Sequence, residues 1–560
     1  MEKIWLQNYP PKIPYNIDEL PSFNSIPEMF EHTCEEFSSL PAFYSMGVTL
    51  SFQQLEIESR ALAAWFQTKL HLKKGDRIAI MLPNILQYPV AMFAALRAGL
   101  IVVNVNPLYT ASELVHQVND SGAKTIIVLS NFLRTVQQAL PQTPIKHVIV
   151  TNIGDLFPKP KAFAIHFYLK YIARKIPFIT IPGAHDFRDA ILKGKTKTLT
   201  PVKITSEDIA FLQYTGGTTG VAKGAMLSHK NIVSNVLQAE TWFSQLLTRG
   251  KEIMITALPL YHIFSLLANC FFISKIGGLN VLIANPRDIK RMVSDMSKIK
   301  FTVMTGVNTL FNALVKFPDF AKLDFSSLKM CLGGGMAVQR AIAEQWRQVT
   351  GVTLIEAYGL TEASPCVASN PADLKAYNGT VGLPLPSTDV CVLDDEGHEV
   401  PIGEVGELAI KGPQVMMGYW KNPLETAKVF TPEGWLLTGD IVSIDEKGYI
   451  SIRERKKDMI IVSGFNVYPN EIEDVLARLA GVREVAVVGV PDRNSGEAVK
   501  AFIVKDRPDL TAEEVTSYCY NYLTGYKIPK QIEFCDELPK SNVGKILRRA
   551  LRDSTVKVAS

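Results

Sequence analysis

Residues 76–130 alternate between short apolar runs and longer segments with helical spacing. Buried strands are predicted at RIAIML, IVVNVNP and KTIIVLS, because each is a short apolar run beside polar or turn residues. Helices are predicted between them at ILQYPVAMFAALRAG and ASELVHQVNDSG, which both end in glycine. This alternation predicts a parallel sheet with helices on both faces.

A second α/β unit is indicated between Ile253 and Met330, with strands at MITALPL, NVLIANP and FTVMTGV and a helix after His262. From about residue 381 the pattern changes to short strands separated by glycine and proline, which predicts a small β-rich subdomain. A charged run, RERKKD, precedes a final segment that has the size of a small domain.

The predicted fold class is therefore α/β, with two doubly wound subdomains and a small β-barrel-like subdomain in one large N-terminal domain. We place this domain at residues 1–454 and its β-rich part at about 381–454. A hinge is expected at 455–458, followed by a small α+β C-terminal domain at 459–560.

Composition narrows the class of protein. The chain of 560 residues has 47% hydrophobic and 20% charged residues, as globular proteins do, and its net charge of +4 is mildly basic. Its 7 cysteines and 9 histidines show no C-x-x-C or H-x-x-x-H spacing, so neither a disulfide framework nor a zinc site is expected.

The opening segment lacks the apolar core of a signal peptide, and no apolar run reaches the roughly 18 residues of a membrane span. We expect a soluble protein that can still rest on a membrane.

The segment at 158–178, PKPKAFAIHFYLKYIARKIPF, mixes aromatic and basic residues. One interpretation is an amphipathic basic helix that lies on an anionic membrane. The alternative is a surface helix whose apolar face packs on the body of the protein.

The sharpest chemical feature is YTGGTTGVAKG, from Tyr214 to Gly224. Its glycines allow the backbone to approach a ligand closely, and its hydroxyls, amides and lysine suit phosphate groups. The spacing is not that of a Walker A loop, because Lys223 lies three residues beyond Gly220 and precedes a glycine. A flexible hairpin is the alternative.

This loop resembles the phosphate loop of the adenylate-forming superfamily, which contains acyl-CoA synthetases, luciferases and adenylation domains. Further segments match that superfamily in order and cover nearly the whole chain: PLYHIF (259–264), GGGMAV (333–338), YGLTEASP (358–365), EGWLLTGD (433–440) and PKSNVGKILRR (539–549). The resemblance implies ATP, Mg²⁺ and coenzyme A as ligands, and a C-terminal domain that is mobile between two reaction states.

The resemblance also assigns roles to matching positions. Tyr358 would stack on adenine, Thr361 would contact the α-phosphate, and Asp440 with Arg455 would hold the ribose. Lys457 falls at the hinge position, and Gly464 would approach CoA in the second state. The full set of implied nucleotide and CoA contacts is Tyr214, Thr215, Gly216, Gly217, Thr218, Thr219, Gly220, Lys223, Gly333, Gly334, Gly335, Ala357, Tyr358, Gly359, Thr361, Asp440, Arg455, Lys457, Gly464 and Lys545.

Lys545 is implied as the main catalytic residue, with Thr215, Lys223 and Glu362 beside it. A cation between a carboxylate and an α-phosphate stabilises the crowded anionic transition state. Glu362 is the implied Mg²⁺ ligand, since a carboxylate oxygen suits this hard cation.

The acyl site is expected at His262, Phe264, Val307, Gly335 and Met336, with Leu310 and Phe311 as further lining. All these apolar residues would serve equally well as ordinary core, and a lone histidine on an apolar face is often a core residue.

More narrowly, EGWLLTGDIVSIDEKGYISIRERKKD and GFNVYPNEIEDV resemble bacterial long-chain fatty-acid–CoA ligases. Small departures from the family pattern occur at Ala357, Ala363, Arg453 and Glu454. The implied enzyme is cytoplasmic, reversibly associated with the inner membrane, and supplies acyl-CoA to β-oxidation or lipid synthesis. No nucleic-acid partner is expected, and the resemblance leaves room for a homodimer.

Three other classes remain open at this point: an acyl-AMP ligase that loads a carrier protein, a luciferase-like monooxygenase, and a non-catalytic nucleotide-binding or scaffold protein. The segment EGWLLTGDIVSIDEKGYISIRERKKD, which resembles fatty-acid–CoA ligases, argues against the monooxygenase. The intact set of Thr215, Lys223, Glu362, Asp440, Arg455 and Lys545 argues against the non-catalytic protein.

Overall fold

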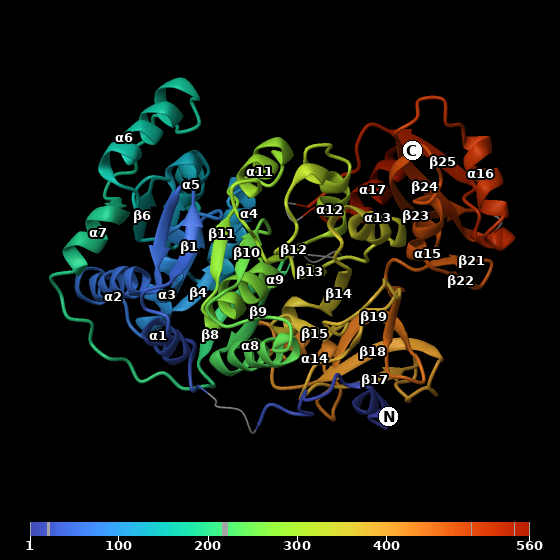
Figure 1. Cartoon of the computed structure of the whole chain (residues 1–560), viewed down its shortest axis with the longest axis horizontal. Coiled ribbons are helices and arrows are strands. Elements are labelled where there is room, and N and C mark those ends of the chain that lie inside the picture. The colour runs from blue at the N-terminus through green and yellow to red at the C-terminus, as the bar shows by residue number, and fades with distance from the viewer. Residues whose placement is uncertain (1, 19–22, 216–221, 494, 542–543, 559–560) are drawn as a thin grey trace.

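The computed structural model describes residues 2–18, 23–215, 222–493, 495–541 and 544–558, with side chains described as far as residue 554. These residues form four sheets. Two large sheets and a small antiparallel sheet make up the body, and the last sheet belongs to the C-terminal part of the chain (Figure 1).

The first large sheet contains the α/β unit predicted at residues 76–130. Its spatial order is β7 (His185–Asp186), β6 (His147–Thr151), β5 (Thr125–Leu129), β3 (Arg77–Met81), β4 (Ile101–Asn104), β8 (Ile209–Thr215) and β9 (Lys223–Ser228). All neighbours pair in parallel except β8 and β9, which form an antiparallel hairpin. The three predicted strands are β3, β4 and β5, and the two predicted helices are α3 (Gln87–Arg97) and α4 (Ala111–Ser121).

The second large sheet contains the unit predicted from Ile253 onward. Its order is β16 (Leu383–Pro384), β15 (Cys366–Ser369), β14 (Leu354–Gly359), β13 (Met330–Gly333), β12 (Val303–Gly306), β10 (Ile253–Thr256), β11 (Leu279–Leu282), β1 (Pro41–Ser45) and β2 (Val48–Ser51). Strand β1 comes from the start of the chain and pairs in parallel with β11, a long-range contact that no local pattern predicts.

Local signals explain where several helices begin and end. Helix α4 has a capping box in which Thr110 and Glu113 bond to each other's backbone N–H, and it ends at Gly122 in the left-handed conformation. Ser228 and Asn231 form the same box at the start of α8. The α- and π-helices of the body are α1 (Ile26–Glu36), α2 (Phe52–Lys69), α3, α4, α5 (Leu133–Ala139), α6 (Lys159–Phe167), η4 (Tyr168–Ile172), α7 (Phe187–Gly194), α8 (His229–Phe243), α9 (Ile263–Ser265), η5 (Leu266–Phe271), α10 (Phe272–Lys275), α11 (Ile289–Met296), α12 (Asn308–Val315), α13 (Arg340–Thr350) and α14 (Pro423–Val429).

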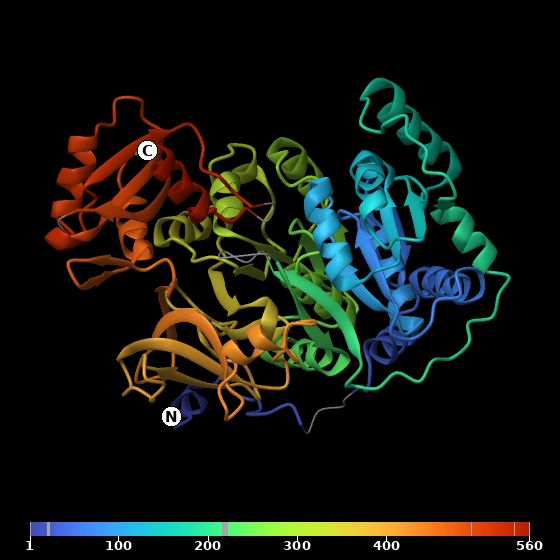
Figure 2. The same ribbon diagram turned by 180° about the vertical axis from the view of Figure 1, so that it is seen from behind.

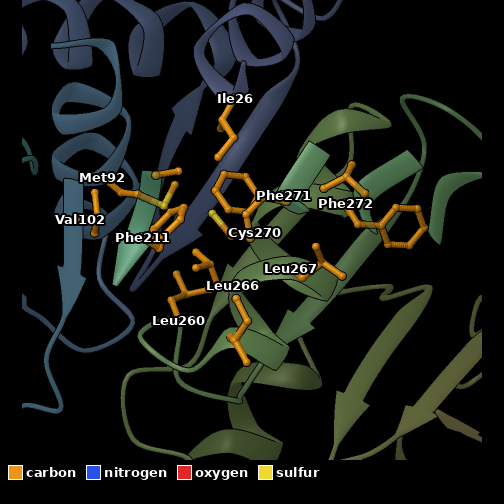
Figure 3. Packing of buried hydrophobic residues seen from close by; sticks show 14 of the residues in the cluster. Ile26, Met92, Val102, Phe211, Leu260, Leu266, Leu267, Cys270, Phe271 and Phe272 are labelled. Atoms are coloured by element: carbon orange, nitrogen blue, oxygen red, sulfur yellow. The ribbon is translucent and has the colours of Figure 1, made fainter. Parts of the chain in front are cut away.

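One large cluster of buried side chains joins the two sheets. Phe211 of β8 and Met92 of α3 belong to it together with Phe271 of η5 (Figure 3). Phe271 contacts Phe211 edge to face, with ring centroids 6.0 Å apart. The turn η5 is a π-helix, so its side chains are displaced from the usual helical spacing.

The β-rich region forms an antiparallel sheet in chain order, from β17 (Asp389–Leu393) and β18 (Val405–Lys411) to β19 (Leu436–Ile444) and β20 (Ile450–Arg455). Trp5, near the start of the chain, is buried against the turn between β19 and β20. A Cβ added to Gly448 in that turn would lie 2.5 Å from Trp5.

The C-terminal part has its own sheet and its own core. Its elements are β21 (Ile460–Val462), β22 (Phe465–Val467), α15 (Pro469–Leu476), β23 (Val482–Asp492), β24 (Gly496–Lys505), α16 (Ala512–Tyr520), β25 (Gln531–Cys535) and α17 (Arg548–Val558). The expected hinge at 455–458 begins at the last residue of β20 and continues through the turn before β21, and its mobility stays a prediction. Within the described part of the chain, no helix is both long and apolar enough to cross a membrane.

Candidate active site

A cavity of about 1520 Å³ lies where β8, β14 and β19 meet the C-terminal part of the chain. Most of the residues singled out in the sequence line it. They are Tyr214, Thr215, Lys223, His262, Phe264, Val307, Gly334, Gly335, Met336, Ala357, Tyr358, Gly359, Thr361, Glu362, Asp440, Arg455, Lys457 and Lys545.

The remaining candidates lie elsewhere. Gly216, Gly217, Thr218, Thr219 and Gly220 are outside the described residues. Gly333 is buried at the end of β13, where an added Cβ would lie 2.8 Å from Val338. Gly464 lies in the turn between β21 and β22 and does not line the cavity, so its expected approach to CoA requires another domain orientation and stays a prediction.

Asp440 and Arg455 face each other across neighbouring strands. They are direct partners in the β19–β20 register, and Arg455 Nε lies 3.0 Å from Asp440 Oδ1. The Tyr358 hydroxyl donates to the other carboxylate oxygen of Asp440, with Oη–Oδ2 at 2.5 Å. A buried carboxylate and a flat aromatic ring are therefore held side by side at the end of β14.

Acidic partners hold the groups around the glycine- and threonine-rich loop. Lys223 forms an ion pair with Glu425 of α14 and lies 5.1 Å from the centre of the Tyr419 ring. The Tyr419 hydroxyl donates to Glu362 Oε1 at 2.7 Å. Sequence reasoning missed Tyr419 and Glu425, because nothing in their own segment marks them as neighbours of a loop about 200 positions earlier.

Lys545 enters the cavity on a tight loop. Its backbone N–H donates to Ser541 Oγ at 3.1 Å, and its carbonyl accepts from Ser541 N at 2.7 Å. Gly544, at φ +82°, approaches the start of α12 so closely that a Cβ would lie 2.7 Å from Thr309 Oγ1. Thr309 donates to the Gly544 carbonyl at 3.0 Å. The loop is thus docked on the body beside Val307.

Electrostatics make Lys545 unusual. Burial, assisted by the nearby charge of Arg455, lowers the pKa of Lys545 to about 8. Burial and the neighbouring Lys545 lower the pKa of His262 to about 4, so this histidine is neutral at pH 7. His262 Nδ1 accepts the backbone N–H of Phe264 at 3.3 Å at the start of α9.

Arg548 follows the Lys545 loop and bonds both to the β-rich sheet of the body and to the C-terminal part. Its Nη1 lies 2.8 Å from Glu454 Oε1 on β20, and its Nη2 lies 2.8 Å from Glu473 Oε2 on α15. Glu454 is buried, and it also accepts the backbone N–H groups of Arg455 and Asn470. The sequence marked Glu454 only as a departure from the family pattern; the structure gives it a partner 94 positions away.

The apolar part of the cavity differs from the expected lining. Phe264, Val307 and Met336 line it, but the expectation for Leu310 and Phe311 is wrong. Phe311 is buried in a separate core cluster against Trp346, with ring centroids 4.7 Å apart, and Leu310 packs on the same cluster. Apolar side chains from α8, η5 and α10 take their place: Ala239, Phe243, Leu267, Ala268 and Phe272. We call these five residues the apolar arm.

The Mg²⁺ ligand expected from the sequence is a single carboxylate, that of Glu362. Among the described residues, no group of three or more His, Cys, Asp or Glu side chains is arranged to hold a metal ion. Glu362 nevertheless presents a carboxylate to the cavity, with one oxygen bonded to Tyr419. One carboxylate beside substrate phosphates is a donor set that suits Mg²⁺.

Comparison with known proteins identifies the class. Residues 30–420 match the family model described as AMP-binding enzyme, and residues 471–545 match the AMP-binding enzyme C-terminal domain. Two solved structures share the fold over their whole length. One is ATP-bound MatB from Rhodopseudomonas palustris (TM-score 0.82, 27% identity, 96% of this chain and 100% of that one). The other is the anthranilate CoA ligase AuaEII with anthranoyl-AMP (TM-score 0.85, 26% identity, 97% and 100%). The fold is that of an adenylate-forming enzyme.

The chain therefore belongs to the AMP-binding enzyme family. A long-chain-fatty-acid–CoA ligase from Yersinia pestis is 54% identical over 560 residues, which is 100% of this chain and 99% of that protein.

The pKa of Lys545 generates a prediction about pH. The lysine is a cation below about pH 8 and neutral above it. We therefore expect kcat/KM for ATP in adenylate formation to fall as the pH rises through this value. The fall should reach up to about tenfold for each pH unit. Pyrophosphate exchange measured from pH 6 to 10 checks this. Lys545→Arg stays charged across the range and should lack the alkaline fall, whatever its remaining rate. A fall that persists unchanged in Lys545→Arg would assign the titration to another group, such as Lys457.

Proposed function

We propose that this chain is an AMP-forming long-chain fatty-acid–CoA ligase. In the first step, a carboxylate oxygen of the fatty acid bonds to the α-phosphorus of ATP while the bond to the β-phosphate bridging oxygen breaks, releasing pyrophosphate. In the second step, the sulfur of coenzyme A bonds to the acyl carbon, the bond to the adenylate oxygen breaks, AMP leaves, and the thiol proton passes to solvent.

The observation that carries this proposal is the make-up of the cavity. One part is lined by charged and hydrogen-bonding groups from β14, β19 and β20, another by the apolar arm, and Lys545 and His262 lie where these parts meet. Such a cavity suits an acid with a long alkyl chain bound beside a nucleoside triphosphate. The relative from Yersinia pestis, named for this reaction and alike over its full length, supports the same assignment.

We assign the first step to groups that are already in place. Asp440 and Arg455 bind the ribose, Tyr358 stacks on the adenine, and Thr361 faces the α-phosphate. Lys545 bridges the carboxylate and the α-phosphate, where a fixed cation in a site that excludes water stabilises negative charge strongly. Removing a contact of this kind lowers the rate by a factor of about 10²–10³.

The phosphate chain needs further positive charge. We assign Lys223 and Thr215 to the β- and γ-phosphates, so ATP must displace Glu425 from Lys223 when it binds. Glu362 would hold Mg²⁺ together with phosphate oxygens; when bound, this ion neutralises the charge that develops on the leaving pyrophosphate.

The second step needs a different arrangement of the C-terminal part. Lys545 fills the position beside His262 in the present orientation, and Gly464 lies outside the cavity. We infer that rotation about residues 455–458 withdraws Lys545 and brings the Gly464 turn toward the thiol of CoA. A few hinge residues absorb backbone changes of this size.

Location and partners are part of the proposal. Long-chain acids partition into membranes, so we place the enzyme in the cytoplasm at the surface of the inner membrane, where it traps entering acids as CoA esters. A homodimer stays a prediction, because the described chain carries no feature that requires a second copy.

The proposal is tested by AMP release from purified protein with ATP and Mg²⁺, using acids from about four to eighteen carbons with and without CoA; each further methylene buried in the arm contributes roughly 0.8 kcal/mol. We expect turnover that depends on CoA and rises toward long chains. Adenylate that accumulates equally with and without CoA would instead favour a ligase that loads a carrier protein. A short or aromatic optimum would contradict the substrate assignment.

The apolar arm generates a second prediction. Phe243 and Phe272 face each other with ring centroids 6.1 Å apart, and we infer that they close the arm. Phe272→Leu should raise kcat/KM for eighteen-carbon relative to twelve-carbon acid, by about fourfold for each extra methylene admitted.

Phe271→Leu is the matched control for this substitution. Phe271 is the neighbouring residue, equally buried, but it points toward Ile26 and Phe211 and does not line the cavity (Figure 3). Its substitution should leave the chain-length ratio unchanged. If the ratio of kcat/KM for eighteen-carbon over twelve-carbon acid is the same in the two variants, Phe272 does not set the length of the apolar arm.

A further inference from the structure

We propose that residues 158–178, which we call the basic aromatic segment, form the surface by which this protein docks on an anionic lipid bilayer. The inference rests on the proposed function only in that long-chain acids reside in membranes. The evidence for the surface itself comes from exposure, ring contacts and charge in a part of the chain remote from the cavity.

The segment stands out from the body. Helix α6 and the π-helical turn η4 project from the edge of the first large sheet, at the end of the molecule opposite the C-terminal part (Figures 1 and 2). None of their side chains is buried. The alternative of a surface helix packed on the body holds for one side only, where Ala162 and Ile165 are half-buried against the core. The large aromatic side chains of the segment stay exposed.

The outward face carries a row of aromatic rings. Phe163, Phe167 and Tyr171 are four residues apart, and their ring centroids are 6.3 and 5.2 Å from one another. Phe178 continues the row at 5.9 Å from Tyr171. Phe163 is 73% exposed and Phe178 is 72% exposed. Large apolar side chains gathered this way mark an interaction surface.

The inner side of the helix fixes this orientation. Gly154 lies so close to it that an added Cβ would be 2.8 Å from Ala162 Cα. Ala162 and Ile165 pack on the main core, and Lys161 donates to the carbonyl of Met46. The helix is therefore attached along one side, and the aromatic row faces away from the protein.

Charge identifies the partner as an anionic surface. Between Phe157 and Ala184 the chain has five basic residues and no Asp or Glu. Lys159, Arg174 and Lys175 are exposed, and Lys170 lies 5.8 and 5.4 Å from the rings of Tyr171 and Phe178. Aromatic rings together with Lys and Arg are the side chains that favour the interface of a bilayer with anionic headgroups.

The same charge disfavours a second copy of this chain as the partner. Two such faces in contact would bring ten like charges together on surfaces that have no acidic side chain to pair with them in this segment. An anionic bilayer accepts both the rings and the cations.

The test is sedimentation of the full chain with vesicles made from two parts phosphatidylcholine and one part phosphatidylglycerol. We expect binding that weakens with added salt and is lost on vesicles of phosphatidylcholine alone. Lys159→Gln/Arg174→Gln/Lys175→Gln should lower the partition by about fivefold for each cation removed. Phe163→Ser/Phe167→Ser/Tyr171→Ser should lower it by about tenfold or more.

The matched control is Tyr520→Ser/Tyr522→Ser, which removes two aromatic side chains that are 68% and 60% exposed in the C-terminal part. It should bind vesicles as the unchanged protein does. All variants should retain activity toward detergent-dispersed acid, which separates docking from catalysis. Binding that is equal in the segment variants and the control, or independent of phosphatidylglycerol, would overturn the proposal. So would light scattering that shows a dimer which the aromatic substitutions dissociate.

Discussion

Arg548 bonds at once to Glu454 on β20, the last strand of the β-rich sheet, and to Glu473 on α15 of the C-terminal part. The position of Lys545 depends on this contact, because the two residues lie three positions apart on the same tail. Arg548 is also bonded to Asn470 at 2.7 Å. Removal of one partner from a buried ion pair of this kind is destabilising by about 3–5 kcal/mol, and here the loss would fall on the orientation of the C-terminal part.

The need for such a contact follows from the charge in the cavity. Burial lowers the pKa of Lys545 to about 8, and the nearby positive charges of Arg455 and Lys457 add to this effect. Without ATP, the burial of Lys545 beside two other positive charges is electrostatically unfavourable. The carboxylates of Asp440, Glu454 and Glu473 offset this positive charge through their ion pairs with Arg455 and Arg548. A bound triphosphate would offset the positive charge that faces the cavity. In the proposed reaction, loss of pyrophosphate would remove part of that charge and would favour the rotation that we propose for the second step.

The sequence predicted the elements whose signals are local. Strands β3, β4 and β5 follow from short apolar runs, and helices α3 and α4 follow from periodic segments that end in glycine. The adenylate-forming motifs located the part of the cavity wall that contains Tyr358, Asp440 and Lys545. Contacts between distant positions were not predictable. Phe311 and Phe272 are both apolar residues in apolar stretches, yet only Phe272 faces the cavity, because the π-helical turn η5 and the packing of α12 decide which way each ring points. Glu454 was visible only as an unusual residue until Arg548 supplied its partner.

The central claim is that Lys545 acts in adenylation and not in thioester formation. The most direct measurement is the rate of each half-reaction in Lys545→Ala: pyrophosphate exchange with ATP and fatty acid, and acyl-CoA formation from preformed acyl-AMP. The account predicts a loss of about 10²–10³-fold in the first and little change in the second. Equal losses in both half-reactions would contradict it.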